Sequence, residues 1–249
     1  SEYVEWLETT QLKALSLGQR QHESIPLLLK KSLMQVHPQV NEIFPLIGFL
    51  SPKLFDRKLI ATSSLLSNSV SFTILGELVN YGLLLRPSQK YIISHALVHS
   101  YALDNLPVSG KALAKLVNWY KSKIAVNSQE PIVLSVEDRA HLLNLLVHCQ
   151  NYELQSEILN IAQPFEMMLN VQGHWAERLS VIEEGLAAAE ALNDQEAIGI
   201  WLSRKGAIVS DQGDPKEAIN YFSQAIIQFE NGKNRLEEAK VLERLSLNY

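Results

Sequence analysis

Two histidines four residues apart form the clearest chemical pattern in the chain. His95 and His99 lie in a segment, 95–106, whose apolar spacing predicts a helix. Imidazoles at positions i and i+4 of a helix lie on one face and can bind a metal ion together. No acidic residue or cysteine stands at the spacing of a third ligand. A metal site is therefore a weaker hypothesis for His95 than a capping or packing role.

Other residues with chemical potential lack the companions that their chemistry needs. Ser135, Asp138 and His141 are close in sequence, but no glycine-rich nucleophile turn supports a catalytic triad. The single Cys149 lies in an apolar helical run, which favours a core position, and it excludes an intramolecular disulfide. Neither Gly-Lys pair, at 110–111 or 232–233, completes the Gly-x4-Gly-Lys-Ser/Thr loop that wraps phosphates. The sequence thus predicts no enzyme acting through this chain alone.

Composition and charge predict a folded chain in two parts. Of 249 residues, 47% are hydrophobic and 20% are charged, which suits a sizeable core. No apolar run reaches the length of a membrane span and no signal peptide is present, so we expect a cytoplasmic protein. Residues 1–130 carry a net charge of +4 and residues 131–249 a net charge of −9. This shift indicates a domain boundary near residue 130.

The first half predicts short helices and one hairpin. A lead-in helix is expected within 1–24. Ser51 and Pro52 have the residue types of an N-cap and a first helical position, so we expect a helix to begin there. A helix at 68–80 is followed by the sequence LLLRPSQKYII, which indicates strand, turn and strand. Helices followed by a hairpin wing are typical of a winged-helix domain, which we place at 25–106.

The second half predicts stacked helix pairs. A connecting helix and linker are expected over 107–130, with the joint at 127–131. Ser135 has the position of an N-cap for the next helix. The segments 173–194 and 213–234 align at an offset of 40, with apolar residues in register. Such units bury their apolar faces only against neighbours, so residues 131–249 predict an α-solenoid of tetratricopeptide-like helix pairs. The overall class is mainly α.

In the order of these parts, the chain resembles the C-terminal part of bacterial STAND signalling ATPases of the NB-ARC type. The resemblance is carried by 24–60 and 83–102, which look like the beginning and end of that family's winged helix. It continues in FEMMLNVQGHWAERLSVIEEGLAAAEALND, which resembles the first repeats that follow. The family carries a Met-His-Asp or similar triplet here, which aligns with Ser94-His95-Ala96, so only the histidine is kept. We expect the chain, which begins without Met, to be a fragment of a longer protein.

The resemblance implies a signal-transduction role. In that family ADP binds between an upstream nucleotide module and the winged helix, and the triplet histidine contacts the diphosphate. His95 would then be the ADP phosphate sensor, acting only with the upstream module, and the longer parent protein would bind ATP. The repeats would bind a protein or small-molecule ligand, the winged helix would relay that event, and activation would lead to oligomerisation. This chain itself would hold no cofactor.

Three alternatives remain open from the residues. The winged helix could make the protein a DNA-binding transcription regulator, although the recognition position, 71–81, carries Glu77 and no Lys or Arg. A weak basic edge would come from Lys53, Arg57, Lys58, Arg86 and Lys90. The repeats could instead form a protein-binding scaffold without a nucleotide switch. Finally, an acidic groove for a basic peptide could be formed by Glu183, Glu184, Glu190 and Asp194.

Overall fold

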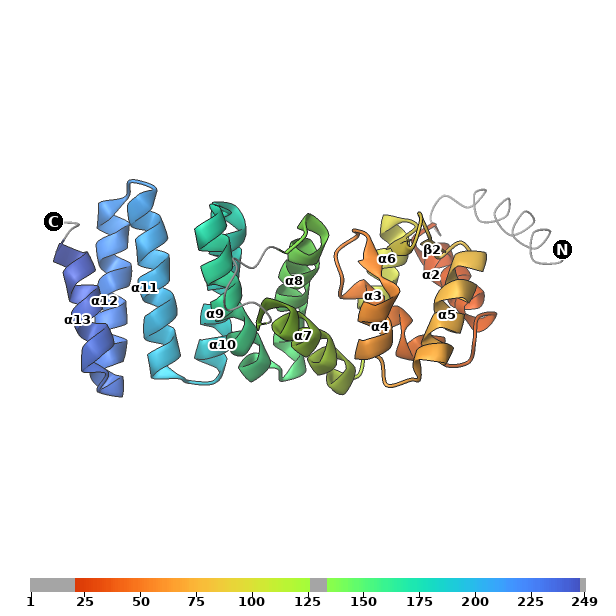
Figure 1. Cartoon of the computed structure of the whole chain (residues 1–249), viewed down its shortest axis with the longest axis horizontal. Coiled ribbons are helices and arrows are strands. Elements are labelled where there is room, and N and C mark those ends of the chain that lie inside the picture. The colour runs from red at the N-terminus through yellow and green to blue at the C-terminus, as the bar shows by residue number, and fades with distance from the viewer. Residues whose placement is uncertain (1–20, 126–133, 247–249) are drawn as a thin grey trace. The chain divides into compact units, whose positions relative to one another are not determined.

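The computed structural model describes residues 21–125 and 134–246, which are mainly helical with one small sheet (Figure 1). The lead-in helix expected within 1–24 and the linker expected at 127–131 fall largely or wholly outside these residues. The chain divides into two compact units. Unit 1 consists of the described residues up to Gly48 together with Leu54–Val108. Unit 2 consists of Phe49–Lys53 together with the described residues from Ser109 onward. Among the described residues, no helix is both long and apolar enough to cross a membrane.

Unit 1 alternates short helices with three short strands. Its elements in chain order are α2 (Gln21–Met34), η1 (Val40–Glu42), α3 (Phe44–Gly48), β1 (Phe55–Asp56), α4 (Arg57–Ser63), α5 (Asn68–Asn80), β2 (Leu84–Leu85), β3 (Lys90–Ile93) and α6 (Ala96–Asp104). The predicted helix at 68–80 and the predicted hairpin are confirmed. The hairpin turn contains Ser88 in a left-handed conformation, with φ of 60°.

The sheet has the order β1-β3-β2, and both pairings are antiparallel. Phe55 of β1 lies opposite Tyr91 of β3, and their rings stack. The sequence did not predict β1, because a strand of two residues is too short to show a period. The prediction that Ser51 and Pro52 begin a helix was wrong: α4 begins at Arg57, and the Asp56 side chain caps it by accepting a hydrogen bond from the Lys58 N–H at 2.7 Å.

The core of unit 1 is formed where α3 packs on α6. Phe44, Leu46 and Ile47 of α3 are all buried. A methyl group at Gly48 would lie 2.6 Å from the Leu103 backbone nitrogen, so only glycine allows this approach of the two helices. The position of α6, and of the residue that caps it, is therefore fixed by backbone packing.

Unit 2 consists of longer helices joined by tight turns. Its elements are α7 (Gly110–Ala125), α8 (Val136–Cys149), η2 (Gln150–Tyr152), α9 (Gln155–Gln172), α10 (Trp175–Ala191), α11 (Gln195–Asp211), α12 (Pro215–Gly232) and α13 (Arg235–Ser246). The most extensive packing within it joins α11 to α12, followed by α9 to α10. The N-cap predicted at Ser135 is confirmed, since its hydroxyl accepts a hydrogen bond from the Asp138 N–H at 3.1 Å.

The turns of unit 2 recur every twenty residues. Residues 173, 193, 213 and 233 all have positive φ values, and each follows a long helix. In every case the N–H of that residue and the next N–H bond back to the helix, as at Gly213, which donates to Ser210 O, and Asp214, which donates to Val209 O. These paired bonds satisfy the last carbonyls of each helix. Asp194, Asp214 and Asn234 then cap the helix that follows.

The sequence alignment at an offset of 40 is only partly reflected in burial. Ile182 and Phe222 correspond and are both buried, as are Trp201 and Val241. Leu202 is buried, but its counterpart Leu242 is 46% exposed. The difference arises at α13, beyond which the structure describes no further helix.

Candidate functional site

His95 is the N-cap of α6. Its backbone is extended, with φ of −156° and ψ of 151°, and its Nδ1 accepts a hydrogen bond from the Leu97 N–H at 3.1 Å. Since a backbone N–H can only donate, Nδ1 carries no proton and the neutral ring carries its proton on Nε2. His95 is exposed. The residue therefore combines a structural bond on one nitrogen with a hydrogen-bond donor on the other.

The two histidines of the i, i+4 pair differ in environment. His99 is half-buried on α6 and takes part in further interactions, whereas His95 is exposed at the first turn. Across residues 21–125 and 134–246, no group of three or more His, Cys, Asp or Glu side chains could hold a metal ion. The pair thus lacks a third ligand within that part of the chain.

The residues considered for a triad are used in separate structural bonds. The Ser135 hydroxyl bonds to the Asp138 carboxylate, which also pairs with Lys123. His141 is 1% exposed, and its Nδ1 lies 3.0 Å from the Ser51 hydroxyl. Ser135 and His141 are therefore not joined to each other, and the hydroxyl that His141 contacts is that of Ser51.

Cys149 is fully buried, and burial raises the pKa of its thiol to about 12. The thiolate is the reactive form of cysteine. At neutral pH this side chain is therefore a small apolar group of the core.

The acidic residues of the hypothetical basic-peptide groove are partly paired within the chain. Glu183 lies 3.4 Å from the Lys205 amine, and Glu184 accepts a hydrogen bond from Gln150 at 2.9 Å. Asp194 caps α11 by accepting a hydrogen bond from the Ala197 N–H at 3.0 Å. Glu190 is exposed on α10. Of these four residues, Glu183 is the one whose contact with a cation, Lys205, offsets its negative charge.

The residues considered for DNA contact are also engaged in unit 1. The Arg57 guanidinium lies over the Phe72 ring at 4.5 Å, and that of Arg86 lies over the Tyr91 ring at 5.3 Å. Glu77 of α5 accepts a hydrogen bond from the His37 N–H at 2.6 Å. Lys53 belongs to the segment of unit 2 at Phe49–Lys53. Arg57 and Lys58 of α4 are nevertheless exposed, whereas α5, at the recognition position, carries no Lys or Arg that could contact bases.

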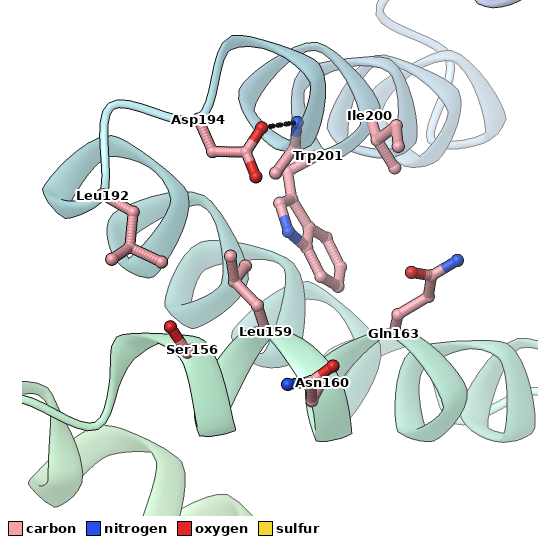
Figure 2. A pocket seen from close by; sticks show the side chains of 9 residues that line it. Ser156, Leu159, Asn160, Gln163, Leu192, Asp194, Ile200 and Trp201 are labelled. Carbon is pink, nitrogen blue, oxygen red and sulfur yellow. Dashed lines mark hydrogen bonds between the residues drawn. The ribbon is translucent and has the colours of Figure 1, made fainter.

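A groove that the sequence did not predict lies between α9 and α11. Its volume is about 360 Å³, and Figure 2 shows side chains from both helices and from the α10–α11 turn around it. The apolar members are Leu159, Leu192, Ala197, Ile200 and Trp201, and the polar members are Ser156, Asn160, Gln163 and Asp194. The groove thus offers an apolar surface edged with hydrogen-bonding groups, as ligand sites commonly do.

Pro164 interrupts the hydrogen-bond ladder of α9. It has no N–H, so the Asn160 carbonyl lacks its usual donor at position i+4. Asn160 also lines the groove through its side chain. The α9 side of the groove therefore offers side-chain amides as its hydrogen-bonding groups.

A buried ion cluster adjoins the groove. The Glu166 carboxylate of α9 accepts hydrogen bonds from Arg178 of α10 at 2.5 Å and from Arg204 of α11 at 2.8 Å. The side chains of Glu166, Arg178 and Arg204 are 4%, 8% and 17% exposed. The Arg204 guanidinium also lies 4.9 Å from the centre of the Trp201 ring, so the cluster and the groove share this tryptophan.

The ion cluster carries more positive than negative charge. The pKa of Arg204 is lowered, first by burial; Glu166 opposes this change, and Arg178 and Arg244 add to it. Glu237 also raises that pKa, but it is paired with Lys240 at 2.6 Å. Arginine stays protonated even so. Glu166 is therefore the carboxylate bonded to both guanidinium groups, and Glu237 acts on Arg204 more weakly.

Sequence reasoning missed this cluster, although one signal for it exists. Glu166 lies on the same helical face as the buried Ala162 and Leu169, so a charge interrupts an apolar stripe. A charge in such a position requires a partner, because an unpaired buried charge is costly. The sequence does not reveal that the partners come from α10 and α11.

Comparisons of the chain with protein-family models, with curated proteins and with solved structures found no match.

Proposed function

We propose that the chain is the sensor and relay part of a STAND-type signalling ATPase, the family that its sequence resembles. In this proposal unit 2 binds a protein or small-molecule ligand. Unit 1 passes that event to an upstream nucleotide module through His95, which contacts bound ADP. The observation that carries the proposal is the position of His95, exposed at the first turn of α6 with Nε2 as a hydrogen-bond donor.

The order of elements in unit 1 supports a winged-helix interpretation. Strand β1 lies between two helices, α3 and α4, and pairs with β3, the second strand of the hairpin that follows α5 and the central strand of the sheet. A winged-helix domain has three helices, of which the first two are separated by a strand that joins the wing hairpin. The lack of Lys and Arg on α5 favours a role in protein packing over DNA binding.

The recurrent turns of unit 2 support a repeat interpretation. Left-handed residues at 173, 193, 213 and 233 join helices of similar length through the same pair of backbone bonds. The preferred packing of α9 with α10 and of α11 with α12 is that of antiparallel helix pairs. Stacked pairs of this kind form extended surfaces that bind ligands.

The chemistry proposed for His95 follows from its two nitrogens. The bond from the Leu97 N–H to Nδ1 holds the ring at the start of α6. The Nε2–H can then donate to a phosphate oxygen, and the positive end of the helix dipole favours the same charge. Loss of the diphosphate would remove the hydrogen-bond partner of Nε2 and leave the bond from the Leu97 N–H to Nδ1 in place.

The test compares two substitutions of His95 in the full-length protein. His95→Asn keeps a side chain that caps helices well, whereas His95→Ala removes the cap at a cost of about 1 kcal/mol. We expect both variants to release ADP faster than the wild type, and only His95→Ala to lower the melting temperature. ADP affinity that is unchanged in His95→Asn would overturn the sensor role. A gene lacking a Gly-x4-Gly-Lys-Ser/Thr loop upstream of Ser1 would overturn the nucleotide mechanism as a whole.

A scaffold without a nucleotide switch is the second candidate, and the groove between α9 and α11 favours it, because a groove can bind a partner without ADP. The two candidates differ in one observable. In a switch, ligand binding to unit 2 changes the ADP affinity of the full-length protein, and in a scaffold it does not.

A further inference from the structure

We propose that the groove between α9 and α11 binds an extended peptide segment of a partner protein, in which an apolar residue is followed two positions later by an acidic residue. This inference rests on the proposed function, since it names the kind of ligand that unit 2 would take. It differs from the basic peptide that the sequence suggested: Asp194, the charged residue among those that line the groove, is used as the N-cap of α11, and the ion cluster next to Trp201 contains two arginines.

The apolar residue of the peptide would lie on the α11 side of the groove. Ile200 and Trp201 of α11 line this part, and Leu159 of α9 lines the groove with them. Gly185 lies against the six-membered ring of Trp201, and the Arg204 guanidinium lies 4.9 Å from its ring centre. Trp201 is only 2% exposed, so the half-buried Leu159 and Ile200 would supply most of the apolar contact.

The peptide backbone would be bound by the α9 side. Asn160 and Gln163 are exposed side-chain amides one helical turn apart, and each can both donate to and accept from a peptide bond. Gln163 extends from α9 toward α11 in Figure 2.

The acidic residue would pair with the ion cluster. Glu166 balances only one of the charges of Arg178 and Arg204, and Arg204 retains N–H groups beyond the one that bonds Glu166. A second carboxylate in this place would complete the charge balance of the cluster. Partly desolvated guanidinium groups bind carboxylates more strongly than fully exposed ones do.

The spacing of the two subsites matches an extended chain. Residues Ile200 and Arg204 are one turn apart on α11, which is about 6 Å along the helix. In an extended peptide, residues i and i+2 point to the same side and lie about 6.6 Å apart. An apolar residue at Ile200 and Trp201 therefore brings the residue two positions later to Arg204.

The experiment uses three pools of fluorescein-labelled nonapeptide amides with the 249-residue chain. All pools contain a central leucine, and the residue two positions later is Glu, Gln or Lys. The remaining positions are random. Fluorescence polarisation measures binding at low ionic strength. We expect the Glu pool to bind about three- to tenfold more tightly than the Gln pool, and the Lys pool to bind most weakly.

Two substitutions of opposite charge at Gln163 test whether the peptide binds in the groove. Because Gln163 is exposed, Gln163→Glu and Gln163→Lys are expected to fold normally. Gln163→Glu should weaken binding of the Glu pool about threefold, and Gln163→Lys should strengthen it by a similar factor. The same changes at Gln224, which is exposed on α12, are the matched control and should leave binding unchanged.

Arg204→Gln adds a test of the cluster itself. It should abolish the preference for the Glu pool over the Gln pool, with circular dichroism used to verify folding. Absence of binding by every pool, equal binding of the Glu and Gln pools, or no response to the Gln163 substitutions would each overturn the proposal. These measurements need no nucleotide, so their failure is separate from a failure of the ADP test on His95.

Discussion

The indole of Trp201 lies so close to the backbone of Gly185 that a methyl group there would be 2.4 Å from Cε2 of the ring. This contact joins α10 to α11 and sets the position of a side chain that lines the groove. Glycine is needed here for space, because any larger residue must displace a buried ring. The floor of the groove therefore depends on a residue that no ligand would touch.

Gly185→Ala is expected to destabilise the protein. Forcing a methyl group against the buried Trp201 ring should lower the free energy of unfolding by about 1–3 kcal/mol, despite the better helix propensity of alanine. Gly76→Ala in α5 is the control, since a methyl group there meets no atom within 4 Å and should be neutral or stabilising. Urea unfolding compares the two variants. Equal stability of both would mean that the Trp201 ring moves without cost.

Glu166→Gln is expected to cost far more stability than the same change on the surface. It leaves Arg178 and Arg204 buried without a counter-charge, and breaking a buried pair in this way costs about 3–5 kcal/mol. Glu183→Gln is the matched control: that side chain is 54% exposed, and its pair with Lys205 should contribute less than about 1 kcal/mol. Thermal unfolding of both variants measures the difference. A small effect at Glu166 would mean that water reaches the cluster.

The recurrent turns predict opposite effects of glycine at equivalent positions. Lys233 has a φ of 56°, which is unfavourable for a residue with a Cβ atom, and Gly213 occupies the matching place in the preceding turn. Lys233→Gly should therefore stabilise the protein by up to about 1 kcal/mol, and Gly213→Ala should destabilise it by about 1 kcal/mol. Chemical denaturation of the two variants provides the measurement. Destabilisation by Lys233→Gly would show that the lysine side chain contributes to the turn.

The raised pKa of Cys149 predicts that the folded protein loses stability at alkaline pH. Its pKa is about 12 in the folded chain against an ordinary value of 9.0, so the folded protein retains a proton that the unfolded chain releases above pH 9. The stabilising contribution is complete below pH 9 and falls by about 1.4 kcal/mol per pH unit as the pH rises toward 12.

The measurement for Cys149 is a comparison with Cys149→Ala, which cannot titrate. The difference in unfolding free energy between the wild type and this variant should be about 1.4 kcal/mol smaller at pH 10 than at pH 8. A difference that is the same at both pH values would contradict the raised pKa. A thiol reagent should also react with the wild type only after unfolding, because the native thiol is buried.

Long elements with clear periodicity were predictable from the sequence. The helices now described as Asn68–Asn80 and Gly110–Ala125 and the hairpin around Arg86 all follow from apolar spacing and turn residues. Strand β1 was not predictable, because two residues show no period and their partner, β3, lies more than thirty residues away. The beginning of α4 was misplaced because Ser51 and Pro52 have the residue types of a helix start without forming one.

The candidate sites also differ in how far the sequence alone predicts them. The capping role of His95 was one of the alternatives drawn from the sequence, because a cap is a local relationship between neighbouring residues. The groove and its ion cluster depend on side chains from three helices, such as Glu166 and Arg204, which are 38 residues apart. Distances of this kind are set by helix packing, and a single sequence does not reveal them.

The interchangeable turns at 173 and 213 make the length of unit 2 adjustable. Both turns place a left-handed glycine at the end of one helix, and the N–H groups of that glycine and of the next residue bond back to the helix in the same way. A deletion that joins Gly173 directly to Asp214 would keep this local geometry, and a duplication of the same segment would keep it as well. Such a chain can be shortened or extended by whole helix pairs through simple recombination, without requiring a new turn to evolve.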